Sequence, residues 1–239
     1  MIAALVAMKI PRRSASRGQQ RILHGLKEGY KYGLGFPPIR YILINLAFLS
    51  LMGVPYTVLM PVFARDILGG GPHTLGFLVG MSGVGALLSA LYLASRKSVI
   101  GLGRVVAIAS AIFGCSLVCF SFSRYVPLSL LLSLCTGFGF MSVITSTNTI
   151  LQTISEEDKR GRVMSLYAMA FMGMTPFGSL IIGALADRIG APHAVAVGGI
   201  VCILSSYLFF SRLPVIRKLI RPIYVEKGIL SEVRQLPAP

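Results

Sequence analysis

Long apolar stretches alternate with short basic segments along most of this chain. Six stretches of 18 to 28 residues contain no Asp, Glu, Lys, Arg or His. A helix of roughly 17–25 apolar residues crosses the ~30 Å hydrocarbon core of a bilayer, and a helix without a polar face is buried in protein or lipid. The pattern therefore predicts an all-α integral membrane protein, a bundle of six transmembrane helices. The predicted spans are Tyr41–Ala64, Leu75–Ser95, Val105–Phe122, Val126–Thr153, Val163–Ala186 and Ala194–Ser211.

The composition argues against three other classes of protein. Hydrophobic residues make up 54% of the chain and charged residues 13%, against about 25% charged residues in soluble domains. A chain this apolar is not disordered, and it has too few charges to cover the core of a soluble enzyme. The net charge of +15 would suit nucleic-acid binding. Because the charges lie between the apolar stretches, we expect no nucleic-acid partner.

The distribution of Lys and Arg predicts the orientation of the chain in the membrane. Four segments share one side by parity: those before the first span and after the second, fourth and sixth. They carry 20 basic residues, and the other side carries Arg65, Arg124 and Arg188. Basic residues accumulate in cytoplasmic loops. We therefore predict a multi-pass protein of the plasma (inner) membrane with both termini in the cytoplasm.

The segments outside the spans complete a prediction of four regions. Residues 1–8 are apolar but too short to cross a membrane. They match the last turns of a preceding transmembrane helix, or else a short interfacial N-terminus. Residues 9–40 form a basic cytoplasmic linker, in which residues 21–35 have the spacing of an amphipathic surface helix. Residues 41–211 form the six-helix domain, and residues 212–239 form a basic cytoplasmic tail.

The fourth span has a polar side and an apolar side. At 100° per residue, four of its side chains fall within about 60° of arc, with a second polar strip beside them. The opposite side, which includes Val143 and Ile150, is predicted to face lipid. Polar groups in hydrocarbon need partners or water, so the polar side is predicted to line a substrate cavity. Hydrogen bonding between helices is the alternative. The two strips are Met141, Thr145, Asn148 and Gln152, and Ser142, Ser146, Thr149 and Thr153.

Further polar and conformationally special residues lie in the first and fifth spans. Polar side chains predicted to bind substrate there are Asn45, Tyr56, Tyr167 and Thr175. Proline bends a helix, and glycine allows bending or close packing. Gating bends or hinges are therefore predicted, with static kinks and packing as the alternatives. The hinge candidates are Pro55, Pro61, Gly173, Pro176 and Gly178, and small residues four apart in the second span predict a packing surface.

The sequence offers little support for other chemistry. Its 4 cysteines are scattered, with no His or carboxylate beside them, and its 3 histidines lie outside the spans. It has no glycine-rich phosphate loop with a lysine. We therefore predict that the chain is not an enzyme and that it has no catalytic residue, metal site or cofactor. Arg160 and Arg162 precede the fifth span and are predicted to anchor its cytoplasmic end, with a gating contact to a second half as the alternative.

Several runs of sequence resemble major facilitator superfamily transporters. The run Arg160-Gly-Arg-Val-Met-Ser-Leu-Tyr167, followed by Gly173-Met-Thr-Pro-Phe-Gly178, is similar to the eleventh helix of that superfamily. The similarity is strongest to the branch that includes the enterobactin exporter. The segment from Leu59 to Gly71 resembles helix seven and its outer loop. The resemblance implies that the six spans are helices seven to twelve, the C-terminal half of such a transporter. The loop from Leu93 to Arg104 departs from the superfamily signature because it lacks the aspartate.

The resemblance also implies a function. It suggests secondary active efflux of an amphipathic small molecule, drug-like or siderophore-like, by alternating access. The implied partners are the substrate, the lipid bilayer and an N-terminal six-helix half from the same or an adjacent reading frame. The alternative is a truncated or split membrane fragment that does not transport and acts as a scaffold or partner subunit.

Overall fold

A computed structural model of the chain describes residues 33, 35–96 and 98–230. The regular secondary structure of this part of the chain is helical. Within it, six helical segments are long and apolar enough to cross a membrane, which confirms the predicted fold class. The apolar residues 1–8 and nearly all of the predicted surface helix at 21–35 lie outside the described residues, as do residues 231–239.

The six helical segments contain the predicted spans almost completely and extend past most of their ends. The first and fifth are interrupted by π-helical turns, labelled η, and the other four are continuous. The first segment is α3 (Pro37–Phe48), η1 (Leu49–Gly53), α4 (Tyr56–Val62) and η2 (Phe63–Ile67). The next three are α5 (Pro72–Ala94), α6 (Leu102–Phe122) and α7 (Val126–Ile154). The last two are α8 (Arg160–Ala168) with η3 (Met169–Gly173) and α9 (Met174–Ile189), and α10 (Ala191–Glu226).

Local sequence explains where several of these helices begin. The helices α3, α5, α7 and α10 each have proline in the first turn, where its fixed φ suits the helix and its missing N–H is not needed. A single residue, Gly190, separates α9 from α10, and its φ is 86°. Because this left-handed conformation favours glycine, the junction between the two helices depends on that residue.

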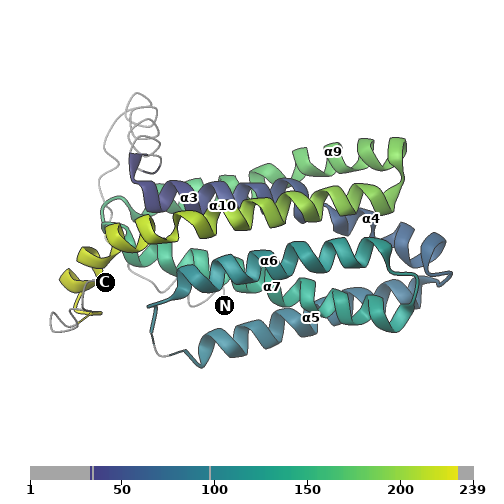
Figure 1. The fold of residues 1–239 in the computed structure, drawn as a ribbon, viewed down its shortest axis with the longest axis horizontal. Helices are drawn as coiled ribbons and strands as arrows, with labels where there is room; N and C mark the ends of the chain where they lie inside the picture. The colour runs from purple at the N-terminus through teal and green to yellow at the C-terminus, as the bar shows by residue number, and fades with distance from the viewer. Residues whose placement is uncertain (1–32, 34, 97, 231–239) are drawn as a thin grey trace, which may run out of the picture.

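The helices lie in two groups that pack along one long contact (Figure 1). The helices α3, α9 and α10 form one group, and α5, α6 and α7 form the other. The groups join where α10 packs against α6. Glycines allow close approach at these contacts: Gly114 of α6 lies against the backbone of Gly199 in α10, and Gly137 of α7 against that of Ser82 in α5. Small residues therefore bring the helices together, as in many membrane bundles.

The small residues of α5 pack only in part. Gly85 faces the backbone of Leu134 in α7, and the Ser89 hydroxyl lies 2.7 Å from that of Ser142. A Cβ built on Gly76, Gly80 or Gly83 would meet no atom within 4 Å. The predicted packing surface is therefore used along the second half of α5, and its first half is open in the described structure.

One end of the bundle carries most of the basic residues, and we call it the basic end. It contains the starts of α3, α6 and α8 and the ends of α5, α7 and α10, and it lies on the left in Figure 1. The opposite end carries Arg65, Arg124 and Arg188. The described basic residues at the basic end are Arg40, Arg96, Arg104, Lys159, Arg160, Arg162, Arg212, Arg217, Lys218, Arg221 and Lys227.

The last helix is much longer than its predicted span. At 1.5 Å per residue, the 36 residues of α10 extend about 54 Å, against ~30 Å of hydrocarbon. The excess lies at the basic end, in the segment predicted as a tail. There Lys227 donates hydrogen bonds to the carbonyl oxygens of Thr153 (2.7 Å) and Ser155 (3.3 Å). Because these carbonyls end α7, Lys227 ties the two helices together.

Candidate functional site

The apolar side of α7 forms part of the bundle core. Val143 and Leu151 are 0% exposed, and Ile150 and Ile154 are 3% exposed. The prediction that this side faces lipid is wrong. The helix lies between α5 and α6, so its apolar side is covered by other helices of the same chain.

The polar side of α7 is left partly open. Thr145, Asn148 and Thr149 are half-buried, and Gln152 is exposed. The Gln152 Nε2 donates a hydrogen bond to the Asn148 Oδ1, and the Thr149 hydroxyl donates to the Thr145 carbonyl at 2.9 Å. These bonds lie within the helix. Asn148 also interacts with the Tyr167 side chain of α8, and Ser142 in the adjacent strip joins α7 to α5 through Ser89.

A cavity of about 400 Å³ opens beside this polar side near the basic end. Met141, Thr145 and Thr149 line it from α7, and Arg96 lines it from the end of α5. The Arg96 guanidinium donates to the Tyr92 hydroxyl at 3.1 Å and to the Ile100 carbonyl at 2.9 Å. Sequence reasoning counted Arg96 as a topology charge. Its position directly after the predicted span Leu75–Ser95 was the available signal that it could line a cavity at that end of the bundle.

Two predicted residues of the fifth segment lie near α7 or in line with it. Tyr167 of α8 is buried, and its hydroxyl donates to the Ile144 carbonyl of α7 at 3.1 Å. Thr175 of α9 is half-buried and donates to the Phe171 carbonyl at 2.8 Å. Tyr167 thus joins the α7 wall directly, while Thr175 lies two turns further along the same segment.

Asn45 and Tyr56 lie inside the bundle, away from the polar side of α7. Asn45 is 2% exposed; its Nδ2 donates to the Ser110 hydroxyl (3.1 Å), and the Ser205 hydroxyl donates to its Oδ1 (2.9 Å). It therefore joins α3, α6 and α10. Tyr56 is also buried, with its ring centroid 6.4 Å from that of Phe113 in an edge-on contact. Packed helices enclose both side chains, and their role in substrate binding stays a prediction.

Four of the five predicted hinge residues lie in or near an irregular turn. Pro55 comes two residues after η1, Pro61 two residues before η2, and Gly173 ends η3, with Pro176 shortly after it. The π-helical pattern is seen in the bond from the Val54 N–H to the Leu49 carbonyl, five residues back, at 2.9 Å. Proline removes an N–H from the helix, and π-turns and prolines are recognised causes of kinks.

Gly178 lies within α9 and packs against the π-turn η1 of the first segment. A Cβ at Gly178 would overlap the carbonyl oxygen of Leu51 in η1 and lie 2.8 Å from Cγ of Pro55. On the other side, a Cβ at Gly198 of α10 would overlap the carbonyl oxygen of Met52. The π-turn η1 is therefore held between glycines of α9 and α10, and in this conformation Gly178 serves close packing.

The predicted anchors lie at the start of α8, at the basic end. Arg160 is half-buried and Arg162 is exposed. The Arg160 Nε is buried and has no hydrogen-bond partner among the described residues.

Comparison with known proteins adds an independent observation. Residues 1–222 match the family model described as transmembrane secretion effector. The chain is 27% identical over 175 residues to the staphyloferrin A transporter of Staphylococcus aureus. The aligned residues make up 72% of this chain and 44% of that protein. It is 26% identical over 172 residues to the multidrug efflux pump Tap of Mycolicibacterium fortuitum, covering 72% of this chain and 42% of the pump.

A third relative is the uncharacterized MFS-type transporter YvqJ of Bacillus subtilis. The identity is 26% over 190 residues, which is 79% of this chain and 45% of that protein. The chain thus spans less than half the length of these curated relatives.

Proposed function

The chain belongs to the transmembrane secretion effector family of major facilitator superfamily transporters, and from this premise we propose that it forms the C-terminal half of an efflux transporter. Six membrane-spanning helices are half of the set from which the superfamily is built. The similarity of the run from Arg160 to Tyr167 to the eleventh helix supports the C-terminal assignment. An N-terminal six-helix half completes the transporter in this proposal.

The polar side of α7 carries the proposal. Its apolar side is buried in the bundle, so the outward direction of this helix presents Thr145, Asn148 and Gln152. Amides facing lipid would lack partners in hydrocarbon. A water-filled cavity between two halves provides those partners, and transporter substrates bind at such midplane interfaces.

The chemistry of this wall suggests the class of substrate. Its strip offers hydroxyls, amides and the thioether of Met141, and none of the described residues in the strip is acidic. Hydroxyls and amides orient a polar group without requiring a particular charge. We therefore expect an amphipathic small molecule. Two of the relatives carry names that refer to transport of staphyloferrin A and to efflux of multiple drugs.

The irregular turns support movement by alternating access. The turns η1, η2 and η3 interrupt the two segments that carry the hinge candidates. Because a π-turn shifts hydrogen bonds by one residue, it provides a place where a helix can bend. The exposed Arg162 at the start of α8 is in position for a contact with the second half when the basic side is closed.

The orientation follows from charge. The basic end carries the Lys and Arg excess that marks the cytoplasmic side, so both chain ends lie in the cytoplasm and the opposite end faces outward. Export in this orientation moves the substrate from the basic end to the other end.

The proposal is tested by transport of dyes in cells that lack other efflux pumps. The chain is produced together with its N-terminal half, and extrusion of ethidium and rhodamine 6G is followed by fluorescence. Replacing Asn148→Leu together with Gln152→Leu is expected to abolish extrusion, because it removes the amides of the wall. Thr136→Val is the matched control: Thr136 is buried on the same helix and bonds to its own backbone at Leu132.

Two results would contradict the proposal. Extrusion at the wild-type rate by the double variant, at equal protein abundance in the membrane, would exclude α7 as the wall. Failure of the wild-type pair to extrude either dye would refute the amphipathic substrate class.

A further inference from the structure

A second and larger cavity lies at the basic end, on a different face from the polar side of α7. Its volume is about 500 Å³, within the range of small-molecule sites. It is bounded by the outer part of α10 and the start of α6, with Ile42 of α3 and Ile150 of α7 behind. The efflux proposal does not use this cavity.

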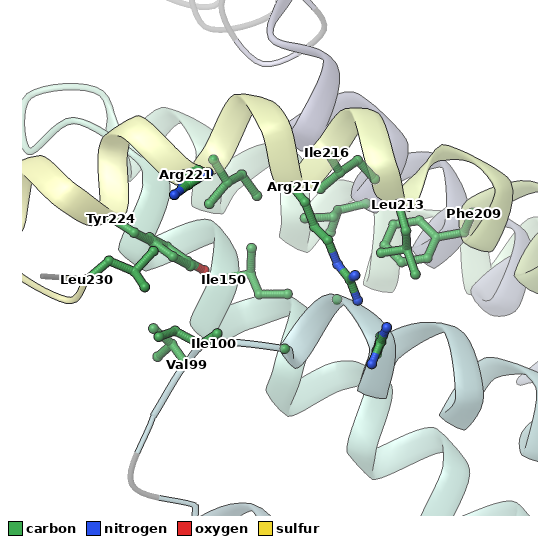
Figure 2. Close-up of a pocket in the computed structure, with 15 residues that line it drawn as sticks. Val99, Ile100, Ile150, Phe209, Leu213, Ile216, Arg217, Arg221, Tyr224 and Leu230 are labelled. Atoms are coloured by element: carbon green, nitrogen blue, oxygen red, sulfur yellow. The ribbon is translucent and has the colours of Figure 1, made fainter. Parts of the chain in front are cut away.

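The inner wall of the cavity is apolar. Phe209, Leu213 and Ile216 follow one another along one side of α10 (Figure 2). Ile220 lines the cavity with them, and all four are buried. Val99 and Ile100 close the opposite side, just before α6. Such a wall suits hydrocarbon chains.

The rim of the cavity is strongly basic. Arg104 lies in the first turn of α6, and Arg217 and Arg221 lie one turn apart on α10. None of the described lining residues is acidic. The positive charges of Arg104 and Arg217 repel each other across the cavity, and the N-terminus of α6 adds a partial positive charge. An anion bound here would relieve this repulsion.

The position along α10 matches the boundary between hydrocarbon and lipid headgroups. The uncharged stretch of this helix ends at Ser211, and Arg212 is its first basic residue. The cavity runs from Phe209 to Tyr224. Its apolar wall therefore begins at the level of the acyl chains, and its arginines lie at the level of the phosphates.

We propose that this cavity binds one anionic phospholipid from the leaflet at the basic end. The phosphate accepts hydrogen bonds from Arg104 and Arg217, since guanidinium groups match phosphate oxygens in geometry. The acyl carbons lie along Leu213 and Ile216. Basic pockets between transmembrane helices on the cytoplasmic side bind anionic headgroups in this way. Lipid binding here needs no transported substrate and does not rest on the efflux proposal.

Charge complementarity argues against residues 1–32 of the chain as the occupant. Residues 1–32 carry seven Lys and Arg and a single acid, Glu28. A segment with that charge is repelled by a basic rim. An anionic lipid carries the opposite charge together with the apolar chains that the wall requires.

The test measures lipid binding to the purified, delipidated protein in detergent. Native mass spectrometry counts bound lipid during titration with phosphatidylglycerol, and with phosphatidylcholine of the same acyl chains. We expect one tightly bound phosphatidylglycerol and at least tenfold weaker binding of phosphatidylcholine. In Arg104→Gln/Arg217→Gln, the phosphatidylglycerol affinity should fall at least tenfold. Lys218→Gln is the matched control, because Lys218 is exposed and follows Arg217 on α10 but does not line the cavity.

Three outcomes would overturn the proposal. Equal affinity for the two lipids would mean that the headgroup charge is not recognised. Equal weakening by Lys218→Gln would mean that only the total charge matters. Displacement of the lipid by inorganic phosphate at millimolar concentration would assign an anion site rather than a lipid site. If the double variant is unstable, Arg217→Lys replaces it. This variant keeps the positive charge but loses the planar guanidinium, so it should bind phosphatidylglycerol more weakly than the wild type does. Unchanged affinity would overturn the assignment of the guanidinium group.

Discussion

Replacing Gly178 with alanine tests whether η1 is held rigidly between α9 and α10. The added Cβ would overlap the carbonyl oxygen of Leu51 and press against Pro55. Both obstacles belong to the backbone or to a proline ring, so no side-chain rotation can relieve the overlap. Gly183, five residues further along α9, is the matched control, because a Cβ there would meet no atom within 4 Å.

The two substitutions should change stability in opposite directions. Overpacking a close contact costs about 1–3 kcal/mol, and a backbone obstacle places Gly178→Ala near the upper end of that range. The better helix propensity of alanine offsets about 1 kcal/mol. The net loss is about 2 kcal/mol, which lowers the melting temperature by about 4–8 °C. Gly183→Ala gains the propensity alone and should raise the melting temperature by about 2–4 °C.

Thermal unfolding of the detergent-solubilised protein, followed by intrinsic tyrosine fluorescence or by loss of a monodisperse chromatography peak, measures both variants. Equal melting temperatures for Gly178→Ala and Gly183→Ala would refute the reasoning, since they would mean that α9 moves away from η1 without loss. A cold-sensitive transport defect in Gly178→Ala alone would agree with it.

Three further predictions follow from contacts at other places. Asn45→Ala removes two hydrogen bonds between helices and should destabilise the protein by about 1–3 kcal/mol in thermal unfolding; Thr57→Ala, at an exposed hydroxyl, should change little. Lys227→Met should speed amide hydrogen exchange at the end of α10 and lower stability by about 1 kcal/mol at most, and unchanged exchange would refute the tie to α7. In a cysteine-free background, a cysteine at Gly71, which is exposed and where a Cβ would meet no atom within 4 Å, should react with an impermeant maleimide in intact cells. One at the exposed Ser98 should react after permeabilisation; the reverse pattern would overturn the orientation.

The sequence predicted the six helices well because bilayer thickness imposes their length. A run without charges longer than 17 residues has few alternatives to spanning. The π-turns escaped prediction, although the nearby prolines marked where the helices are irregular. Proline indicates that a hydrogen bond is missing, but neighbouring helices determine how the backbone adjusts.

The polar side of α7 illustrates what periodicity can and cannot provide. The 3.6-residue period separated Thr145 and Asn148 from Val143 and Ile150 correctly. It did not indicate which neighbour each side meets, and the apolar side proved to face protein. That choice depends on the packing order of helices far apart in the sequence.

Asn45 shows the same limit at a single residue. A buried amide in a span is as consistent with substrate binding as with a joint between helices. Its partners, Ser110 and Ser205, lie 65 and 160 residues away. No local pattern connects them, so the joint is visible only in three dimensions.

The single-residue junction at Gly190 has a mechanical consequence. Because no loop separates them, α9 and α10 meet directly at Gly190, at the end of the bundle opposite the basic end. A small rotation about Gly190 therefore produces a larger displacement at the far end of α10, which is roughly 54 Å long. A 3° change would sweep the far tip by about 3 Å, by the geometry of a rigid rod of that length. The outer part of α10 carries Arg217 and Arg221, so the affinity for a lipid phosphate there would depend on the angle between α9 and α10 at Gly190.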